Sequence, residues 1–369
     1  MKLTSSQQAA MNYINQYAAS RKAAAQASIT EILQMSNIPR SDYEESIEKL
    51  RLDARVALHF HPDRPLDRER NVAQALLQDG VYKSQFETKI SNGSVSAYPG
   101  GVRDLWEKSL FGGAYHTEYI IESERPKYGA LDIMAHSDGP SPRFGSCYFL
   151  LAPAVSHRCT YTYGGSQDDP LEKGTIEAFD DIIAAVLKES FLRENVLGEN
   201  NLFPRQVLDR FTVLLKEPIA ERMKRMPTKN LNYYIEAQVH GNISLQDDVE
   251  ILVADPSFKG TDVGRTLEKL CEQYAIALHW HHGYSIHESE VPSYYRGPTM
   301  PSLAERIAVN HLIDAHTIGI AVNGLHNNPE RWSDRGSYEE VLQELKLMWH
   351  VLVRFGETIS AATTDDFTK

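Results

Sequence analysis

Glu236 is the residue of this sequence whose surroundings most suggest chemistry. It stands inside residues 232–240, a run rich in the aromatic and β-branched side chains that strands favour. A carboxylate in the middle of a strand is costly to desolvate unless it is paired or used in a reaction. The simpler explanation is an edge strand with Glu236 facing water. Against it, the next apolar segment carries Asp247, Asp248 and Glu250, so acidic side chains gather in this region.

The motif His61-Pro62-Asp63-Arg64 ends an apolar run. Pro62 fixes the backbone and Asp63 suits the capping position of a helix over residues 65–77, so an ordinary structural turn is one interpretation. His-Pro-Asp between two helices is also the hallmark of the J-domain, a co-chaperone module. The helix expected before the motif lacks the dense Lys/Arg face of that module. The deciding observation is whether residues 45–64 form one helix or contain a strand.

Two turns present aromatic rings beside glycines. Phe111-Gly-Gly-Ala-Tyr115 is the first, and Arg125-Pro-Lys-Tyr128-Gly is the second. Glycine lets the backbone approach a ligand closely, and a tyrosine face stacks on planar rings. An ordinary loop with buried tyrosines is the alternative for both turns.

A group of histidines, His279, His281 and His282, could supply metal ligands. Zinc catalysis needs three ligands in fixed geometry and an activating carboxylate. The spacing here matches neither a helical pair nor a strand triad. We therefore expect exposed or hydrogen-bonded histidines and no metal, and a zinc hydrolase stays as an alternative function.

Composition excludes some classes of function. The 369 residues carry a net charge of -12, which argues against a nucleic-acid partner because that partner requires a basic stripe. No apolar run approaches the length that crosses a bilayer, so we expect no membrane partner. The first residues lack the apolar region of a cleavable secretory signal. Three widely spaced cysteines fit a reducing compartment.

The order of expected elements is helices, strands, helices, strands, helices, which indicates an α+β fold with a mostly antiparallel sheet. Asn92-Gly93 between two alternating runs predicts a hairpin over residues 81–99. A second strand pair is expected around Gly241, with Glu236 on an inner strand. Further strands are expected at residues 128–134, 146–152 and 158–163, and helices at 1–55, 175–225, 262–277, 302–322 and 337–354.

Taken in order, these pieces resemble the ADP-ribosyltransferase superfamily, nearest to its poly(ADP-ribose) polymerase-like branch. LHFHPDR stands where that branch has a strand ending in a His-Gly-Ser-Arg element, FGGAY resembles its Phe-Gly-x-Gly-Ile-Tyr element, and YYIEAQVH resembles its glutamate strand. The resemblance implies a split antiparallel β core with flanking and inserted helices, and NAD as the substrate. It implies that Glu236 is catalytic and that Tyr115, with Tyr128, stacks on nicotinamide. The implied ribose and phosphate contacts are His61, Asp63 and Arg64.

The motifs HPDR, SQFETKISNGS, LFGGAY, ERPKYGAL, PRFGS, EAQVHG, DPSFKGT and WHHGY are similar to one bacterial domain family across nearly the whole chain. That family includes type III effectors that ADP-ribosylate threonine on host ubiquitin. The resemblance implies a mono-ADP-ribosyltransferase with Asp63 and Glu236 as its catalytic pair and ubiquitin as its acceptor. It implies action in the host cytoplasm after secretion from the bacterial cytoplasm. Arginine-modifying relatives have Glu or Gln where Tyr234 stands here, which speaks against an arginine acceptor.

The resemblance also implies a division of the chain. Residues 1–53 are expected to form an N-terminal helical segment and residues 54–256 a transferase-like core with a helical insertion at about 175–230. Residues 257–369 are expected to form a mostly helical C-terminal segment suited to target recognition. A core of this superfamily needs about 150–200 residues, so the remaining segments, chiefly 175–230 and the residues after 260, are expected to form a surface that binds a protein. The alternative is that these helices only support the sheet.

Overall fold

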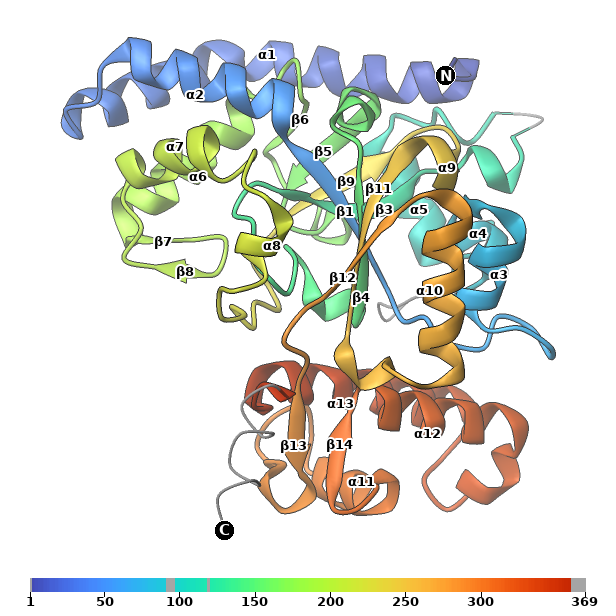
Figure 1. Ribbon diagram of the computed structural model, residues 1–369. Coiled ribbons are helices and arrows are strands. Elements are labelled where there is room, and N and C mark those ends of the chain that lie inside the picture. Colours follow the sequence, from blue (N-terminus) through green and yellow to red (C-terminus); the bar gives the residue numbers. More distant parts are fainter. Residues whose placement is uncertain (1, 91–96, 118–119, 360–369) are drawn as a thin grey trace.

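The computed structural model describes residues 2–90, 97–117 and 120–359 and shows an α+β fold around one large sheet (Figure 1). The eight strands lie in the order β12-β11-β4-β1-β3-β9-β5-β6. All neighbouring pairs are antiparallel except β11 and β12, which confirms the predicted class. Hydrogen bonds join all eight strands, so the sheet is continuous rather than split. The strands are β1 (Arg55–Phe60), β3 (Lys127–Asp132), β4 (Cys147–Leu151), β5 (Cys159–Tyr163), β6 (Lys173–Thr175), β9 (Ile235–Val239), β11 (Val249–Ala254) and β12 (Ala277–Trp280).

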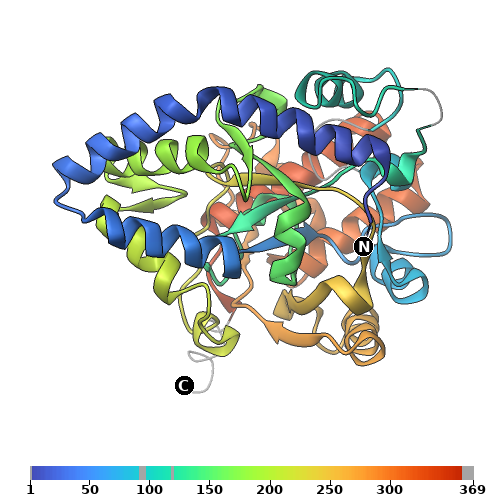
Figure 2. The ribbon, with the colours of Figure 1, turned by 90° about the horizontal axis from the view of Figure 1, so that it is seen from above.

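Helices from the start of the chain and from the insertion pack together. The helices α1 (Ser5–Met35) and α2 (Arg40–Asp53) meet at one end and diverge above the sheet (Figure 2). α1 packs against α6 and β6, and α2 packs against α7. In the described part of the chain, no helix has the length and apolar character needed to cross a membrane. The insertion contains α6 (Asp180–Arg193), β7 (Asn195–Val196), β8 (Glu199–Asn200), α7 (Pro204–Val213) and α8 (Ile219–Arg222).

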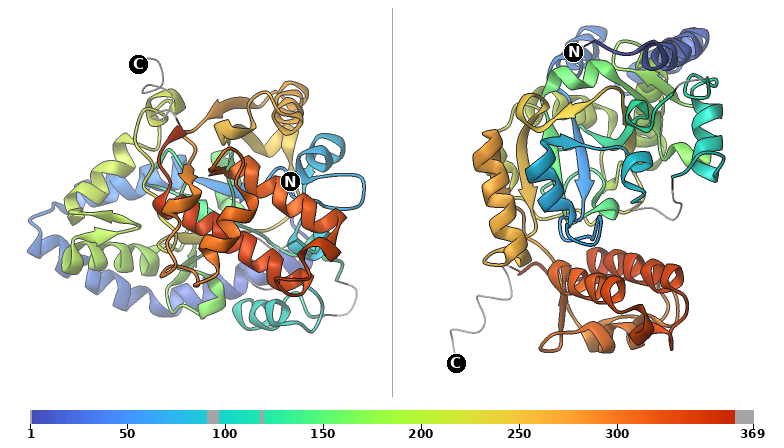
Figure 3. Two further views of the ribbon diagram at one scale, coloured as in Figure 1. Left: turned by 90° about the horizontal axis from the view of Figure 1, so that it is seen from below. Right: turned by 90° about the vertical axis from the view of Figure 1, so that its right-hand side faces the viewer.

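Residues after 256 form both an edge of the sheet and a separate group of elements. β12 extends the sheet beside β11. The strands β13 and β14 pair with each other and gather with α11, α12 and α13 at one end of the sheet (Figure 3). The bounds are α10 (Asp262–Tyr274), β13 (Ser285–His287), α11 (Met300–Ile307), β14 (Leu312–Asp314), α12 (Ala315–Asn327) and α13 (Tyr338–Phe355).

The predicted hairpin over residues 81–99 is wrong in its first half. Only β2 (Val81–Tyr82) is a strand, and α4 (Gln85–Thr88) follows it directly. Ser84 and Glu87 form a capping box, in which each side chain accepts a hydrogen bond from the other residue's backbone N–H. This local hydrogen bonding favours a helical turn over the alternating pattern. The predicted Asn92-Gly93 turn lies outside the described residues.

The predicted pairing of the Glu236 strand with the segment after Gly241 is also wrong. β9 lies between β3 and β5, whereas β11 lies between β4 and β12. The short β10 (Ile243–Ser244) pairs with β2, and α9 (Leu245–Asp248) carries Asp247 and Asp248. Ser244 accepts the N–H of Asp247 and thereby caps this helical turn. The chain therefore crosses the sheet instead of folding back beside β9.

Several predicted helices have different bounds. The helical range expected at residues 175–225 is divided into α6, α7 and α8, and the strands β7 and β8 lie between α6 and α7. The helix expected at residues 65–77 is α3 (Val72–Asp79), and Asn71, not Asp63, caps it. The helix expected at residues 302–322 is divided into α11 and α12, because β14 intervenes and Asp314 caps α12 by accepting the N–H of Thr317.

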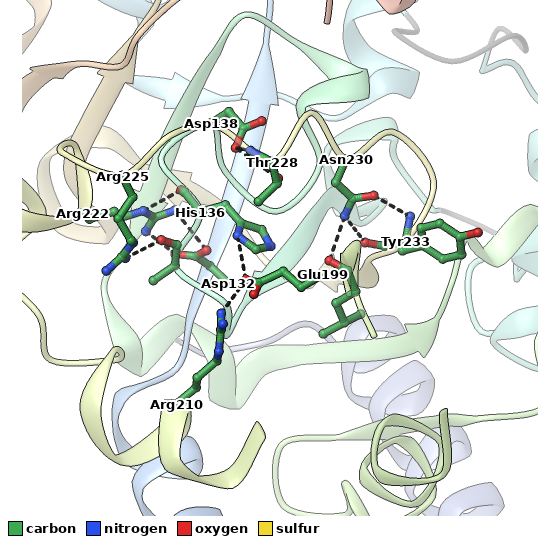
Figure 4. A network of polar contacts seen from close by, with 12 residues as sticks. Asp132, His136, Asp138, Glu199, Arg210, Arg222, Arg225, Thr228, Asn230 and Tyr233 are labelled. Carbon is green, nitrogen blue, oxygen red and sulfur yellow. Dashed lines mark hydrogen bonds and ion pairs between the residues drawn. The ribbon is translucent and has the colours of Figure 1, made fainter. Parts of the chain in front are cut away.

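A buried polar network fixes the loop that follows β3 (Figure 4). Arg222 of the insertion forms two hydrogen bonds with Asp132, at 2.5 and 3.1 Å, and donates a third to the carbonyl of His136 at 2.7 Å. Asp138 accepts the backbone N–H groups of Thr228 and Lys229. It also accepts the hydroxyl of Tyr284, from the C-terminal segment, at 2.7 Å. The loop is thus held by both the insertion and the C-terminal segment.

We expect Arg222→Met to lower the free energy of unfolding by about 3–5 kcal/mol, because it leaves the buried Asp132 carboxylate without its partner. The double variant Arg222→Met/Asp132→Leu should recover most of that loss, since it removes both charges. Chemical denaturation measures the difference. As a control, Arg40→Ala breaks the exposed pair with Glu44 and should have a much smaller effect. A single variant as stable as the wild type would contradict the assignment.

Candidate functional site

A cavity of about 620 Å³ opens beside β9. Its volume is that of a typical small-molecule site. Its walls come from segments far apart in the sequence, including the end of β1, α3, β2, α5 (Val102–Leu110), β3 and β9. Two short 3-10 turns, at Pro142–Phe144 and Ser166–Asp168, complete it. The first of these turns ends the loop that the Arg222 network holds.

The cavity has an excess of positive charge. Five cationic side chains line it, against three carboxylates, although the whole chain has a net charge of -12. One of the carboxylates, Asp79, is neutralised by Lys83 at 2.6 Å. An anionic ligand therefore suits this cavity better than a cationic one. The cationic side chains are Arg64, Lys83, Arg103, Lys127 and Arg143, and the carboxylates are Asp79, Asp168 and Glu236.

Glu236 lies on the cavity wall, on the inner strand β9, as predicted. Its side chain is only 6% exposed. Its Oε1 accepts the backbone N–H of Ser166 at 3.2 Å and the side-chain amide of Gln238 at 3.0 Å. Within the described part of the chain it forms no salt bridge, and burial raises the pKa of this carboxyl above its ordinary 4.5. The opposing residues are small, Ala130 on β3 and Thr162 on β5, which leaves room beside the carboxylate.

Arg103 of α5 is a second buried charge in the cavity wall, and the sequence analysis did not identify it. Its guanidinium lies over the rings of Trp106, at 4.6 Å, and Tyr128, at 5.0 Å. Its Nε is buried and has no hydrogen-bond partner among the residues described. A buried donor without a partner is costly, so a ligand that accepts a hydrogen bond here would relieve the cost.

Three of the predicted contact residues line the cavity with Glu236. Tyr128 presents its ring there, while its hydroxyl donates to Glu107 at 2.7 Å. His61 follows β1 and packs edge-on against Trp349, and burial lowers the pKa of His61. Arg64 lies in the same turn, and burial also lowers its pKa.

Asp63 is not brought to Glu236, so the predicted catalytic pair has no support in this arrangement. The turn places Asp63 outside the cavity lining, with its carboxylate against Gly319 of α12. Its Oδ2 is buried without a hydrogen-bond partner among the described residues, and burial raises its pKa to about 7. Its backbone carbonyl accepts the side-chain amide of Asn323 at 3.1 Å. Asp63 therefore contacts the C-terminal segment.

Tyr115 is not in the cavity lining either, so its position does not suit stacking on a ligand there. Its side chain is 1% exposed and packs against Phe111. Its hydroxyl lies 2.5 Å from Nδ1 of His240. The glycines of the FGGAY turn close a helix end over a small apolar cluster that also contains Ala10, Ile14 and Leu110. The aromatic cavity residues that the sequence analysis did not identify are Phe60, Tyr82, Trp106 and Phe144.

Residues 55–355 match the protein family described as "Protein of unknown function (DUF3626)". The match covers more than half of the chain. This chain belongs to that family. The DUF3626 region begins at β1 and ends in α13, so it includes the whole sheet and every wall of the cavity, but neither α1 nor α2. No curated protein matches the sequence.

The geometry of the DUF3626 region bears on both alternative functions, a J-domain and a zinc hydrolase. Residues 55–60 form a strand, so His61-Pro62-Asp63 does not stand between two helices as in a J-domain. The ring of His281 contacts the carbonyl of Ser146, and that of His282 contacts the carbonyl of Arg225. The two rings are thus hydrogen-bonded to different backbone carbonyl groups. No group of three or more potential ligands (His, Cys, Asp or Glu) suited to a metal occurs in the described ranges.

The buried Glu236 carboxyl predicts a pH-dependent loss of stability. A carboxyl with a raised pKa in the folded protein destabilises the fold once it ionises. This cost is absent below pH 4.5, appears as the pH rises above that value and is complete above the raised pKa. Glu236→Gln keeps the shape and an oxygen that accepts both N–H groups. It should therefore melt at a higher temperature than the wild type at neutral pH, by roughly 2 °C, with the difference shrinking towards pH 4.5.

Differential scanning calorimetry across this pH range measures the difference. The exposed Glu268 on α10 provides the control, because Glu268→Gln should leave the melting temperature unchanged at each pH. A Glu236→Gln protein that melts below the wild type at neutral pH would show that the carboxylate stabilises the fold.

Proposed function

We propose that this protein is a mono-ADP-ribosyltransferase, which cleaves NAD and transfers ADP-ribose to a hydroxyl of a protein. One observation carries the proposal. A buried carboxylate without a cationic partner among the described residues, Glu236, faces a cavity of small-molecule size that carries excess positive charge. NAD combines an anionic pyrophosphate with planar rings, and it develops positive charge on its ribose as the glycosidic bond breaks. The cavity offers a complementary group for each of these features.

In the proposed reaction, the bond between ribose C1′ and the nicotinamide nitrogen breaks, and its electron pair leaves with nicotinamide. The oxygen of the acceptor hydroxyl then forms the new bond to C1′ and loses its proton. Glu236 stabilises the positive charge of the oxocarbenium-like transition state, in which the ribose resembles that of a glycosidase substrate. The same carboxylate takes the acceptor's proton, because a neutral hydroxyl is a weak nucleophile.

The other cavity residues would hold the substrate. Arg103 has unused donor capacity, and guanidinium groups pair well with phosphate oxygens. Arg64 and His61 lie at the end of β1, where the resemblance puts the ribose and phosphate contacts. The rings of Tyr128 and Trp106 line the cavity with the Arg103 guanidinium over them, and the proposal keeps for Tyr128 the stacking role first expected of it.

Ubiquitin is the proposed acceptor, on the strength of the effector-family resemblance. Tyr234 lines the cavity two residues before Glu236, so no acidic or amide side chain stands there to hold an arginine. The acidic chain suits a partner with a basic face, as ubiquitin has. The insertion and the C-terminal segment remain the proposed surface for that partner. Their contacts with α1, α2 and the loop after β3 show that they also support the fold.

Incubation with labelled NAD and purified ubiquitin tests the proposal. The wild type should transfer label to ubiquitin, and mass spectrometry should place it on a threonine. Glu236→Gln should lower the rate roughly 10²- to 10⁴-fold and alter NAD affinity little, because the amide keeps the shape but not the charge that opposes the oxocarbenium. Glu268→Gln should behave like the wild type. Equal turnover by Glu236→Gln and wild type would remove Glu236 from the mechanism, and absence of NAD cleavage by the wild type would end the proposal.

Arg103→Gln should weaken NAD binding by roughly 10- to 150-fold, since a hydrogen bond to a charged group contributes about 1.5–3 kcal/mol. The turnover number at saturating NAD should fall much less, because the phosphates are bound equally in the ground and transition states. Titration calorimetry with NAD measures the affinity. Lys108→Gln, an exposed cation on the same helix, is the matched control. Unchanged affinity in Arg103→Gln would show that the phosphates bind elsewhere.

A further inference from the structure

A line of buried polar side chains leads away from the cavity along the face of the sheet that carries Glu236. Gln238 lies two residues beyond Glu236 on the same face of β9, because successive strand residues alternate between faces, and His240 directly follows the strand with its ring against Thr160. Thr160 stands opposite Gln238 on β5. All three are fully buried, and none lines the cavity. They cannot touch a ligand there, so their polar groups need another explanation.

Hydrogen bonds connect these side chains to Glu236. The amide nitrogen of Gln238 donates to Glu236 Oε1 at 3.0 Å. The opposite orientation of that amide would place its oxygen against the carboxylate, so the charge of Glu236 fixes the direction. The amide oxygen of Gln238 is then an acceptor, and the hydroxyl of Thr160 donates to it at 2.8 Å. Because a hydroxyl has one proton, Thr160 must accept at its other contact.

That contact is Nε2 of His240, at 3.1 Å. His240 is neutral, since burial lowers its pKa to about 3, and a neutral imidazole donates from one nitrogen only. With the proton on Nε2, Nδ1 is an acceptor, and the hydroxyl of Tyr115 donates to it at 2.5 Å. Every proton in the series therefore points towards Glu236.

We infer that Gln238, Thr160, His240 and Tyr115 are positioning residues, a chain of aligned hydrogen bonds that holds the Glu236 carboxylate in one orientation. This inference rests on the proposed function. The hydrogen-bond chain ends on Oε1, which also accepts the backbone N–H of Ser166, so Oε2 is the oxygen left to take the proton of the acceptor hydroxyl. Aligned donors also strengthen one another in a medium of low dielectric constant.

The chain gives the FGGAY turn a role that suits its position. Tyr115 does not line the cavity, yet its hydroxyl begins the series that ends on Glu236. The ring of Tyr115 lies nearly parallel to that of His240, at an interplanar angle of 9°, and Phe111 packs edge-on against both. These contacts keep the imidazole in the plane that the hydrogen bonds require. A turn distant from the ligand therefore acts on the reaction through Glu236.

Three threonine variants test the chain by activity. Thr160→Val keeps the shape but loses the hydroxyl, so we expect the turnover number for NAD to fall roughly tenfold, with NAD affinity unchanged. Thr160→Ser restores the hydroxyl and should recover most of the rate. The control is Thr175→Val, because Thr175 stands opposite Thr160 on β6. Its hydroxyl donates to Asn15, which is not part of the hydrogen-bond chain. Equal losses in Thr160→Val and Thr160→Ser would show an effect of packing alone and overturn the inference.

Nitrogen-15 NMR of the imidazole rings tests the same chain without any enzymatic activity. We expect His240 to carry its proton on Nε2 and not to titrate between about pH 5 and 8. Thr160→Val and Tyr115→Phe should shift its two nitrogen resonances, and Thr175→Val should not. A proton on Nδ1, or a titration in that range, would overturn the chain. If the wild type does not cleave NAD, the proposed function fails, and these spectra alone decide whether the chain exists.

Discussion

The charge of Glu236 inside the sheet is the constraint on which this structure depends. An ionised carboxylate taken out of water needs hydrogen-bond donors or a cation in place of its hydration shell. The described part of the protein supplies hydrogen bonds from Ser166 and Gln238 and no cation within salt-bridge distance. The carboxylate is therefore only partly compensated until a ligand enters the cavity. A residue that served stability alone would be paired or neutral at this position, and this is why we propose a role for Glu236 in binding or chemistry.

The rest of the fold keeps this carboxylate and its surroundings rigid. β9 is held on both edges, by β3 and β5, so the backbone of Glu236 has little freedom. The loop after β3 brings Arg143 to the cavity, and Arg222 fixes that loop to the insertion. Asp63 ties the turn after β1 to α12 through its backbone carbonyl. Segments that do not touch the cavity thus determine its shape.

The sequence predicted the parts of the fold that depend on local pattern. The strand over residues 232–240 was predicted from its β-branched and aromatic residues, and β9 confirms it. The hairpin predicted over residues 81–99 is wrong in its first half, because the Ser84–Glu87 capping box stabilises a helical turn more than a few alternating apolar and polar residues stabilise a strand. The predicted pairing of β9 with the segment after Gly241 is wrong, because the order of strands depends on the packing of the whole sheet. Two strands that are neighbours in sequence suggest a hairpin, but they need not be neighbours in the sheet. Arg103 could not be recognised, since an arginine on an amphipathic helix resembles a surface residue until the contacts with Trp106 and Tyr128 are known.

The distribution of charge separates two kinds of partner. The chain as a whole is acidic, and an acidic surface attracts basic proteins and repels anions. The lining of the cavity has the opposite sign, so an anion that enters it would interact with Arg103 and Arg64, whose side chains are buried. In the proposed reaction these two fields act on different substrates, a basic acceptor protein at the surface and an anionic dinucleotide inside. Glu236 lies in the cavity wall, where the two substrates would have to meet, and its charge there opposes the cationic walls. A carboxylate in such a setting stabilises positive charge that forms during reaction more than it binds the anionic ground state, which is the difference that catalysis requires.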